Sequence, residues 1–377
     1  MSRRAAEQGA VNIGQGFPDY SIDPRLAACV TDAVAAGFNQ YAPMEGSVAL
    51  RVAIAAKIAA AGGRAVDPET ELTVTCGGTE SLYSAIQAVV AAGDEAIVFD
   101  PAYDAYDPAI RLAGGRCIHL PLRAPGFRID WDRVRASLSR RTRLIIINNP
   151  HNPACTVVTA QDLDVLAALV RERAAGDRPL LVLADEVYEH VLYDGRRHQS
   201  VMNHPGLRDH SFAVYSFGKT LHITGWRVGY CVAPPPLTRE LRKVHQFNTF
   251  SIAAPLQAAI TSYLQRHPLA FQDVAGFFSA KRALLHRELE GSGLVLPPAQ
   301  GSYFQLADYG GLPRFAGLDD VQFTEKLINE AGVAVIPLSP FYREPPAGMR
   351  VVRLCVAKRD DTLVEAAQRI RAYTSRA

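Results

Sequence analysis

Four short motifs place residues that can do chemistry at the points where apolar runs end. They are CGGTES (76–81), NNPHNP (148–153), ADEVYEH (184–190) and SFGKTLHITGWRVGY (216–230). The carboxyl ends of parallel strands meet at one edge of a sheet, and ligands bind in the loops that follow them. We therefore expect the four motifs to form a single site.

The first two motifs offer backbone rather than side-chain chemistry. The glycine pair of CGGTES lets the backbone approach a ligand, and the helix start behind it offers free N–H groups and a positive dipole end, which suits a phosphate. Taken alone, the motif could equally be a tight turn with Thr79 as a helix cap. NNPHNP alone could be only a turn.

The other two motifs carry charged side chains next to apolar strands. Asp185 ends such a strand. Burial of a carboxylate there is unfavourable unless a cation or strong hydrogen-bond donors pair with it, which would indicate a functional role; the simpler alternative is that Asp185 is a helix N-cap. Lys219, in similar surroundings, can have a lowered pKa and act as an imine-forming nucleophile, although a surface lysine in a loop is the simpler alternative. Arg227 follows eight residues later.

Together, these features describe a site for pyridoxal 5′-phosphate (PLP). The acid keeps the pyridine nitrogen protonated, so that the ring can accept electrons from a substrate carbanion. The lysine holds the aldehyde as an imine, and Ser216 and Arg227 neutralise the phosphate. A nicotinamide site would need G-x-G-x-x-G after the first strand, which GGTESL does not fit.

The elements that position these motifs follow from the apolar pattern. Strands are predicted at 71–76, 95–99, 116–122, 143–149, 179–185, 212–217 and 228–233. Most lack alternation, as strands buried on both faces do. Helices are predicted between them, for example at 81–93 and at 159–176, the latter with Thr159 as its cap and Gly176 as its stop. This succession predicts an α/β domain with a mainly parallel sheet.

The last hundred or so residues follow a different pattern. A long helix at roughly 268–291 leads to shorter strands and a final helix, which predicts a smaller α+β unit. The first ~24 residues are too short to fold alone and are expected to pack on that unit. We therefore predict a large domain at 25–270 and a small domain formed by 1–24 and 271–377.

Composition argues against several other functions. Among 377 residues, 40 Lys and Arg balance 38 Asp and Glu, whereas binding to nucleic acid or to anionic membranes needs a basic excess. The six cysteines are scattered without a C-x-x-C pair, so we expect reduced thiols and no metal. No run approaches the ~18 apolar residues of a membrane helix, and the N-terminus does not have a signal-peptide pattern. We expect a cytoplasmic protein.

The motifs also resemble those of a known family. GGTES, DPAYDAY, NPHNP, ADEVYEH, SFGKTLHITGWRVGY and VVRLCVAK are similar to the class I aminotransferases of PLP fold type I. Within that family they look most like the bacterial methionine aminotransferases and the kynurenine–glutamine transaminases. VNIGQGFPDY and NQYAPMEGSVALR extend the likeness over nearly the whole chain. The resemblance implies a fold with a mainly parallel seven-stranded sheet, and transfer of an amino group from an L-amino acid to a 2-oxo acid.

The resemblance implies roles for the residues around the cofactor ring. Lys219 would bind the cofactor and move the substrate proton, and Asp185 would pair with the pyridinium nitrogen. Tyr188 and Asn152 would hydrogen-bond the phenolic oxygen. Tyr103 would stack on the ring face.

The resemblance also implies how phosphate and substrate are held. The phosphate would be bound by the backbone of Gly78 and Thr79 and by the side chains of Ser216 and Arg227. Arg353 would grip the α-carboxylate as a bidentate fork near the backbone of Gly16. Tyr41 would reach the phosphate of a neighbouring subunit, so a homodimer with shared active sites is expected. One departure is NPACT, where Ala154 and Cys155 replace the usual small polar residue and glycine.

The side-chain pocket indicates the substrate class less directly. The segment YAPMEG (41–46) contains no arginine to clamp an acidic side chain, and Phe250 offers an aromatic surface unless it is an ordinary core residue. These features favour methionine, aromatic amino acids, kynurenine or glutamine. Two alternatives stay open: a cysteine-conjugate β-lyase on the same scaffold, and a catalytically silent PLP-binding regulator. Balanced charge and the intact set of Lys219, Asp185, Arg227 and Arg353 argue against the regulator.

Overall fold

Helices and strands alternate along most of the chain. The structure is a computed structural model that describes residues 1–173 and 178–375. Its helices are α1 (Ser2–Glu7), α2 (Pro24–Ala35), α3 (Val48–Ala60), α4 (Gly77–Val89), α5 (Tyr106–Leu112), α6 (Trp131–Ser137), α7 (Ala160–Glu172), α8 (Phe217–Thr220), α9 (Pro235–Asn248), α10 (Ala254–Arg266), α11 (Val274–Glu288), α12 (Asp320–Lys326) and α13 (Asp360–Thr374). Its strands are β1 (Val11–Asn12), β2 (Leu72–Thr75), β3 (Glu95–Asp100), β4 (Arg116–Pro121), β5 (Thr142–Asn148), β6 (Leu181–Asp185), β7 (Ser211–Ser216), β8 (Gly229–Val232), β9 (Phe304–Asp308), β10 (Val333–Ala334), β11 (Ile336–Pro337) and β12 (Val351–Cys355).

A seven-stranded sheet forms the centre of the fold. Its strand order is β2-β8-β7-β6-β5-β3-β4. β8 runs antiparallel to both of its neighbours, and the other pairs are parallel. All seven predicted strands are present in this sheet, and the prediction of a mainly parallel α/β fold is confirmed.

Both faces of this sheet are buried, which explains the missing alternation in its strands. In β5, Leu144 and Ile146 belong to the apolar cluster formed with α4, α5 and α9. Ile145 and Ile147 belong to the cluster on the opposite face, which includes the buried residues of α7. Successive side chains of one strand therefore contribute to two different cores.

Helix ends agree with the predictions less closely than the strands do. Thr159 does cap α7, in a capping box with Asp162, whereas the predicted stop at Gly176 lies outside the described residues. α4 begins at Gly77, four residues before the predicted helix, because the glycine pair forms its first turn instead of a loop. α11 is shorter at both ends than the predicted span.

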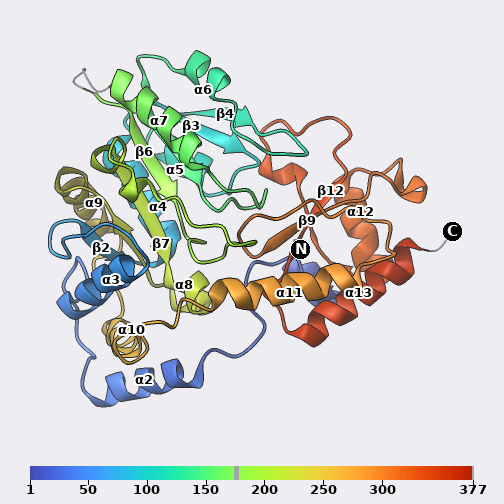
Figure 1. The fold of residues 1–377 in the computed structure, drawn as a ribbon, viewed down its shortest axis with the longest axis horizontal. Helices are drawn as coiled ribbons and strands as arrows, with labels where there is room; N and C mark the ends of the chain where they lie inside the picture. The colour runs from blue at the N-terminus through green and yellow to red at the C-terminus, as the bar shows by residue number, and fades with distance from the viewer. Residues whose placement is uncertain (174–177, 376–377) are drawn as a thin grey trace.

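A second, smaller group of strands lies beside the central sheet (Figure 1). β11, β12 and β9 form a three-stranded antiparallel sheet, and β1 pairs in parallel with β10. α11 packs along α13, and α2 packs on α10 (Figure 1). The early strand β1 is therefore joined to a strand made more than three hundred residues later. Among the described helices, none is long and apolar enough to cross a membrane.

Candidate active site

A cavity of about 560 Å³ opens at the carboxyl ends of the central strands. The predicted site residues that line it are Gly16, Gly78, Thr79, Tyr103, Asn152, Asp185, Tyr188, Ser216, Lys219, Arg227 and Arg353. They come from the ends of β6 and β7, from the helices and loops that follow β2, β3, β5, β6 and β7, from the segment after β1, and from β12. The fold thus brings together side chains that are scattered over most of the sequence.

Lys219 lies in α8, directly after β7, with its amine buried in this cavity. Its Nζ donates a hydrogen bond to the Tyr303 hydroxyl at 2.6 Å and lies 3.4 Å from the carbonyl oxygen of Gly16. The pKa of the amine is lowered to about 8, mainly by burial; Cys355 and Asp185 oppose this shift, and Arg227 and Arg353 add to it. More of this amine is therefore unprotonated at neutral pH than in an ordinary lysine.

Tyr303, directly before β9, is a site residue that the sequence analysis missed. Its buried hydroxyl accepts the hydrogen bond from Lys219 and donates one to the carbonyl oxygen of Gly16. Its ring meets that of Tyr188 edge to face, with 5.0 Å between the ring centres. Nothing in the local segment GSYFQLADY marks this tyrosine, since its partners are distant in the sequence.

Asp185 is the last residue of β6 and is buried. Its Oδ2 accepts a 2.6 Å hydrogen bond from the hydroxyl of Tyr106, which the sequence analysis also missed. Burial raises the pKa of Asp185 to about 6, although the Tyr106 hydrogen bond opposes the rise. Among the residues that the structure describes, its Oδ1 has only a 3.5 Å contact with the backbone N–H of Val187. That oxygen is therefore available to a strong N–H donor.

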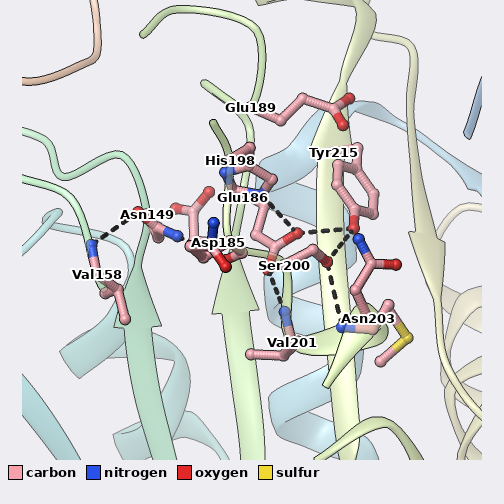
Figure 2. A network of polar contacts seen from close by, with 12 residues as sticks. Asn149, Val158, Asp185, Glu186, Glu189, His198, Ser200, Val201, Asn203 and Tyr215 are labelled. Atoms are coloured by element: carbon pink, nitrogen blue, oxygen red, sulfur yellow. Dashed lines mark hydrogen bonds and ion pairs between the residues drawn. The ribbon is translucent and has the colours of Figure 1, made fainter. Parts of the chain in front are cut away.

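The next residue, Glu186, is held by a polar network (Figure 2). Its Oε2 accepts hydrogen bonds from the Tyr215 hydroxyl at 2.7 Å and from His198 Nε2 at 3.0 Å, and its Oε1 accepts one from the Val201 N–H. Ser200 contacts the same Tyr215 hydroxyl. Burial alone would lower the pKa of His198, but the Glu186 carboxylate outweighs it and raises that pKa. The network ties the loop after Asp185 to β7.

The glycine pair forms a cradle between α4 and Arg227. Gly77 has a φ of +72°, and a Cβ there would lie 2.5 Å from an Arg227 Nη atom. A Cβ on Gly78 would lie 2.9 Å from the Val187 side chain. Thr79 and Arg227 are both exposed at the start of α4. The free N–H groups of this helix start, facing a guanidinium, are suited to an anion such as a phosphate.

Arg353 lies on β12 and is buried against two aromatic rings. Its guanidinium carbon is 4.0 Å from the ring centre of Phe304 and 5.1 Å from that of Phe341. Its Nη atoms donate to Asn152 Oδ1 at 2.8 Å and to the Gly14 carbonyl oxygen at 3.1 Å. Its Nε is buried and has no hydrogen-bond partner in the part of the chain that the structure describes. Such a guanidinium favours an anionic ligand.

Tyr41 and Phe250 do not line the cavity of the single chain. The Tyr41 side chain is 85% exposed and that of Phe250 is 44% exposed. Their rings meet edge to face, with 5.4 Å between the centres. The two residues therefore lie together on the outer surface of the molecule.

The NPACT departure leaves the loop after β5 in place. Ala154 and Cys155 are both buried, and Cys155 has a φ of +62°. Glycine adopts this left-handed conformation most easily, which fits a family that often has glycine here. Asn152 nevertheless reaches Arg353.

Lys219 follows β7 and shares the cavity with Asp185 at the end of β6, on a seven-stranded sheet of this strand order. This arrangement defines the class of fold type I PLP-dependent enzymes. The chain belongs to the aminotransferase class I and II family, which matches residues 9–370. The fold class and the family resemblance inferred from the motifs are both confirmed.

Relatives from other organisms match along almost the full chain. The methionine aminotransferase of Escherichia coli is 46% identical over 371 residues, covering 98% of this chain and 94% of the relative. A probable N-succinyldiaminopimelate aminotransferase of Mycobacterium tuberculosis is 36% identical and covers 100% of this chain and 95% of the relative. Human kynurenine–oxoglutarate transaminase 1 is 30% identical and covers 98% and 93%, respectively.

A solved structure agrees with this relationship. The crystal structure of an Escherichia coli protein identified as a methionine aminotransferase superimposes with a TM-score of 0.93. It is 46% identical in sequence and covers 98% of this chain and 96% of its own. The chain is therefore an enzyme of the aminotransferase type.

Proposed function

We propose that this protein uses PLP to transfer the amino group of an L-amino acid of the methionine, aromatic, kynurenine or glutamine type to a 2-oxo acid. The observation that carries the proposal is the convergence of Lys219, Asp185 and Arg353 on one cavity. The described residues that line this cavity include three cations, Lys219, Arg227 and Arg353, and each has a role in the proposed reaction. No lining cation is left over for an acidic substrate side chain, and the Escherichia coli relative is named for methionine.

The residues present fit PLP, which when bound supplies a ring that accepts electrons from the substrate. The α4 start, Ser216 and Arg227 would hold its phosphate in the cradle that a Cβ on Gly77 would fill. The Oδ1 of Asp185, which has a long contact with the Val187 N–H, would accept a stronger hydrogen bond from the protonated ring nitrogen. Tyr103 would cover one ring face.

Tyr188 and Asn152, which line the same cavity, would contact the phenolic oxygen of the cofactor. Asn152 is already oriented, because its backbone N–H donates to Asn148 Oδ1 at 2.6 Å and its Oδ1 accepts from Arg353. Its amide nitrogen is therefore the atom left to donate into the cavity.

Lys219 carries the proton in this proposal. Its amine removes a proton from the substrate α-carbon, and the burial that lowers its pKa to about 8 favours this base function. Arg353 binds the α-carboxylate and thereby fixes which bond of the α-carbon faces the amine. Phe304 and Phe341 keep water away from that guanidinium, which strengthens its pairing with a carboxylate.

We further propose that the chain works as a homodimer in the cytoplasm. A groove of about 550 Å³, lined in part by Phe38, Tyr41, Pro43 and Ala258, adjoins the exposed Tyr41 ring. A second copy seated there would allow Tyr41 to reach the phosphate of the neighbouring subunit. The six cysteines are free thiols, which fits a reducing compartment.

We also propose the division into a cofactor domain at 25–270 and a small domain at 1–24 and 271–377. The pairing of β1 with β10 supports it, because that pairing attaches the first residues to the late strands.

The decisive experiment follows the visible absorbance of the purified protein with PLP. Addition of L-methionine without an acceptor should bleach the yellow absorbance, and a 2-oxo acid should restore it. Lys219→Ala should abolish the cycle, whereas Lys243→Ala, which removes an exposed lysine on α9, should not. Turnover retained in Lys219→Ala would refute the assignment. Pyruvate and ammonia released from a cysteine conjugate without acceptor would point to the β-lyase instead.

A further inference from the structure

A separate cluster of metal-binding side chain types lies at the end of the central sheet. β4 is the last strand in the sheet order, and its Cys117 and His119 are two residues apart, so they project from the same face. Asp107 approaches them from α5. One donor atom of each residue lies within 4.8 Å of the other two. The active-site cavity is lined by other residues.

His119 is oriented like a metal ligand. Its Nδ1 lies 2.8 Å from Oδ1 of Asp100, so a carboxylate holds one side of the ring. Its Nε2 is buried without a hydrogen-bond partner among the residues described, and is 3.9 Å from Asp107 Oδ1, which is beyond hydrogen-bond reach. A buried, unpartnered nitrogen is unfavourable. Histidine ligands almost always show this pattern, with one ring nitrogen on a carboxylate and the other on the metal.

We propose that Asp107, Cys117 and His119 bind a zinc ion, with Asp100 as the outer carboxylate. Sulfur, imidazole nitrogen and carboxylate oxygen are zinc donors, whereas Mg²⁺ and Ca²⁺ prefer oxygen alone. Zinc bonds of ~2.0–2.3 Å place tetrahedral donor atoms about 3.3–3.8 Å apart, so donor atoms within 4.8 Å of one another need to close by at most about 1.5 Å. Water completes the coordination.

The contacts of Asp100 explain why the protein supplies three zinc ligands rather than four. The second oxygen of Asp100 accepts a 2.8 Å hydrogen bond from the backbone N–H of Arg343, which holds this carboxylate in the outer position. This site contains a single cysteine. The sequence prediction of no metal rested on the absence of a C-x-x-C pair, so it could not detect such a site. This proposal revises that expectation and does not depend on the proposed function.

One cation competes for the site. Arg111 Nε donates to Asp107 Oδ1 at 2.7 Å, one helical turn along α5. The Arg111 side chain is 56% exposed, and exposed pairs of this kind are weak. Zinc should therefore displace Arg111, and removal of that arginine should strengthen zinc binding. A purely structural cluster would not respond in this way.

The test uses the PLP-loaded protein after free cofactor has been removed, because free PLP binds metal ions itself. Titration with zinc should give one bound ion per chain. His119→Gln and Cys117→Ala should each weaken zinc binding at least ~10-fold, and Asp100→Asn by roughly 10–100-fold. Arg111→Ala should tighten it. Cys29→Ala and His204→Gln, which alter a thiol and an imidazole elsewhere, are the matched controls and should bind zinc as the parent does.

Cobalt gives a second readout that is independent of affinity. Cobalt(II) in a tetrahedral site with a thiolate ligand absorbs visible light at wavelengths beyond the yellow cofactor band, and Cys117→Ala should abolish that absorbance. The cofactor absorbance of each variant reports that the protein is folded. A parent protein that binds no zinc, or His119→Gln and Cys117→Ala variants that bind it unchanged, would overturn the proposal.

Discussion

Replacement of Tyr303 by phenylalanine tests how the amine of Lys219 is controlled. The substitution removes one hydroxyl and keeps the ring that packs against Tyr188 and Phe304. Two hydrogen bonds are lost, the one from Lys219 Nζ and the one to the Gly16 carbonyl oxygen. The amine should therefore lose its orientation and part of the stabilisation of its protonated form.

The size of the effect follows from the contacts of this hydroxyl. A hydrogen bond from a charged donor stabilises by ~1.5–3 kcal/mol and one from a neutral donor by ~0.5–1.5 kcal/mol, so the charged amine loses about 1–1.5 kcal/mol more. At 1.36 kcal/mol per pH unit, the pKa of Lys219 should fall about one unit below its value of about 8. Turnover should fall roughly 10–100-fold, because the base is no longer held against the substrate.

The pKa of Lys219 can be measured in the cofactor-free protein. The rate at which an amine-reactive reagent labels Lys219 is followed against pH by mass spectrometry of the peptide, and kcat is measured separately after PLP is added. Tyr309→Phe is the control. Tyr309 directly follows β9 at the opposite end from Tyr303, and its hydroxyl donates to the Leu318 carbonyl oxygen. An unchanged labelling curve together with unchanged kcat in Tyr303→Phe would refute the reasoning.

Three further predictions concern charged groups. Arg353→Lys should lower kcat/KM by roughly 10–150-fold, with a similar rise in KM for every amino acid. The variant loses one charged hydrogen bond of ~1.5–3 kcal/mol to the α-carboxylate, a group that all substrates share. An effect on one substrate alone would contradict this role. Asp185→Asn should abolish turnover. In the parent protein, PLP affinity should drop as pH falls through about 6, because the Asp185 carboxylate becomes protonated there. A PLP affinity that does not change with pH would contradict this role of Asp185. His198→Gln should cost stability below pH ~6.5, and the difference should disappear as pH rises through the raised pKa of His198, because only the protonated imidazole pairs with Glu186. Urea unfolding across pH measures this, and a constant difference would exclude the ion pair.

The sequence was sufficient for the central sheet and for most of the residues around the cavity. Strands such as β5 and β6 are short apolar runs buried on both faces, and such runs can be recognised in the sequence without knowledge of the tertiary structure. Asp185 and Lys219 stand at the ends of such runs, so topology alone brings them together. Helix ends were less accurate: α4 starts at Gly77 because the packing there overrides the low helix propensity of glycine.

Tyr106 and Tyr303 could not be found in the same way. Each is significant because its hydroxyl meets a partner 79 or 84 positions away, and the sequence has 14 tyrosines. The motif DPAYDAY did contain a signal, since its second tyrosine, Tyr106, begins the helix next to the site. Tyr41 is a different case, because the contact predicted for it needs a second chain. Phe250 was predicted to line the substrate pocket, and it does not line the cavity of the single chain.

The bond from Arg353 to the Gly14 carbonyl oxygen has a consequence for biosynthesis. The two residues are 339 positions apart, so the ribosome must add that many amino acids before the bond can form. At ~5–20 residues per second this takes roughly 17–68 s. Over the last 126 of these residues, from Arg227 to Arg353, which take roughly 6–25 s, the nascent chain already carries Lys219 and the phosphate cradle but lacks the wall that grips the substrate. A chain stalled before β12 would therefore still have the means to capture PLP and no means to hold an amino acid.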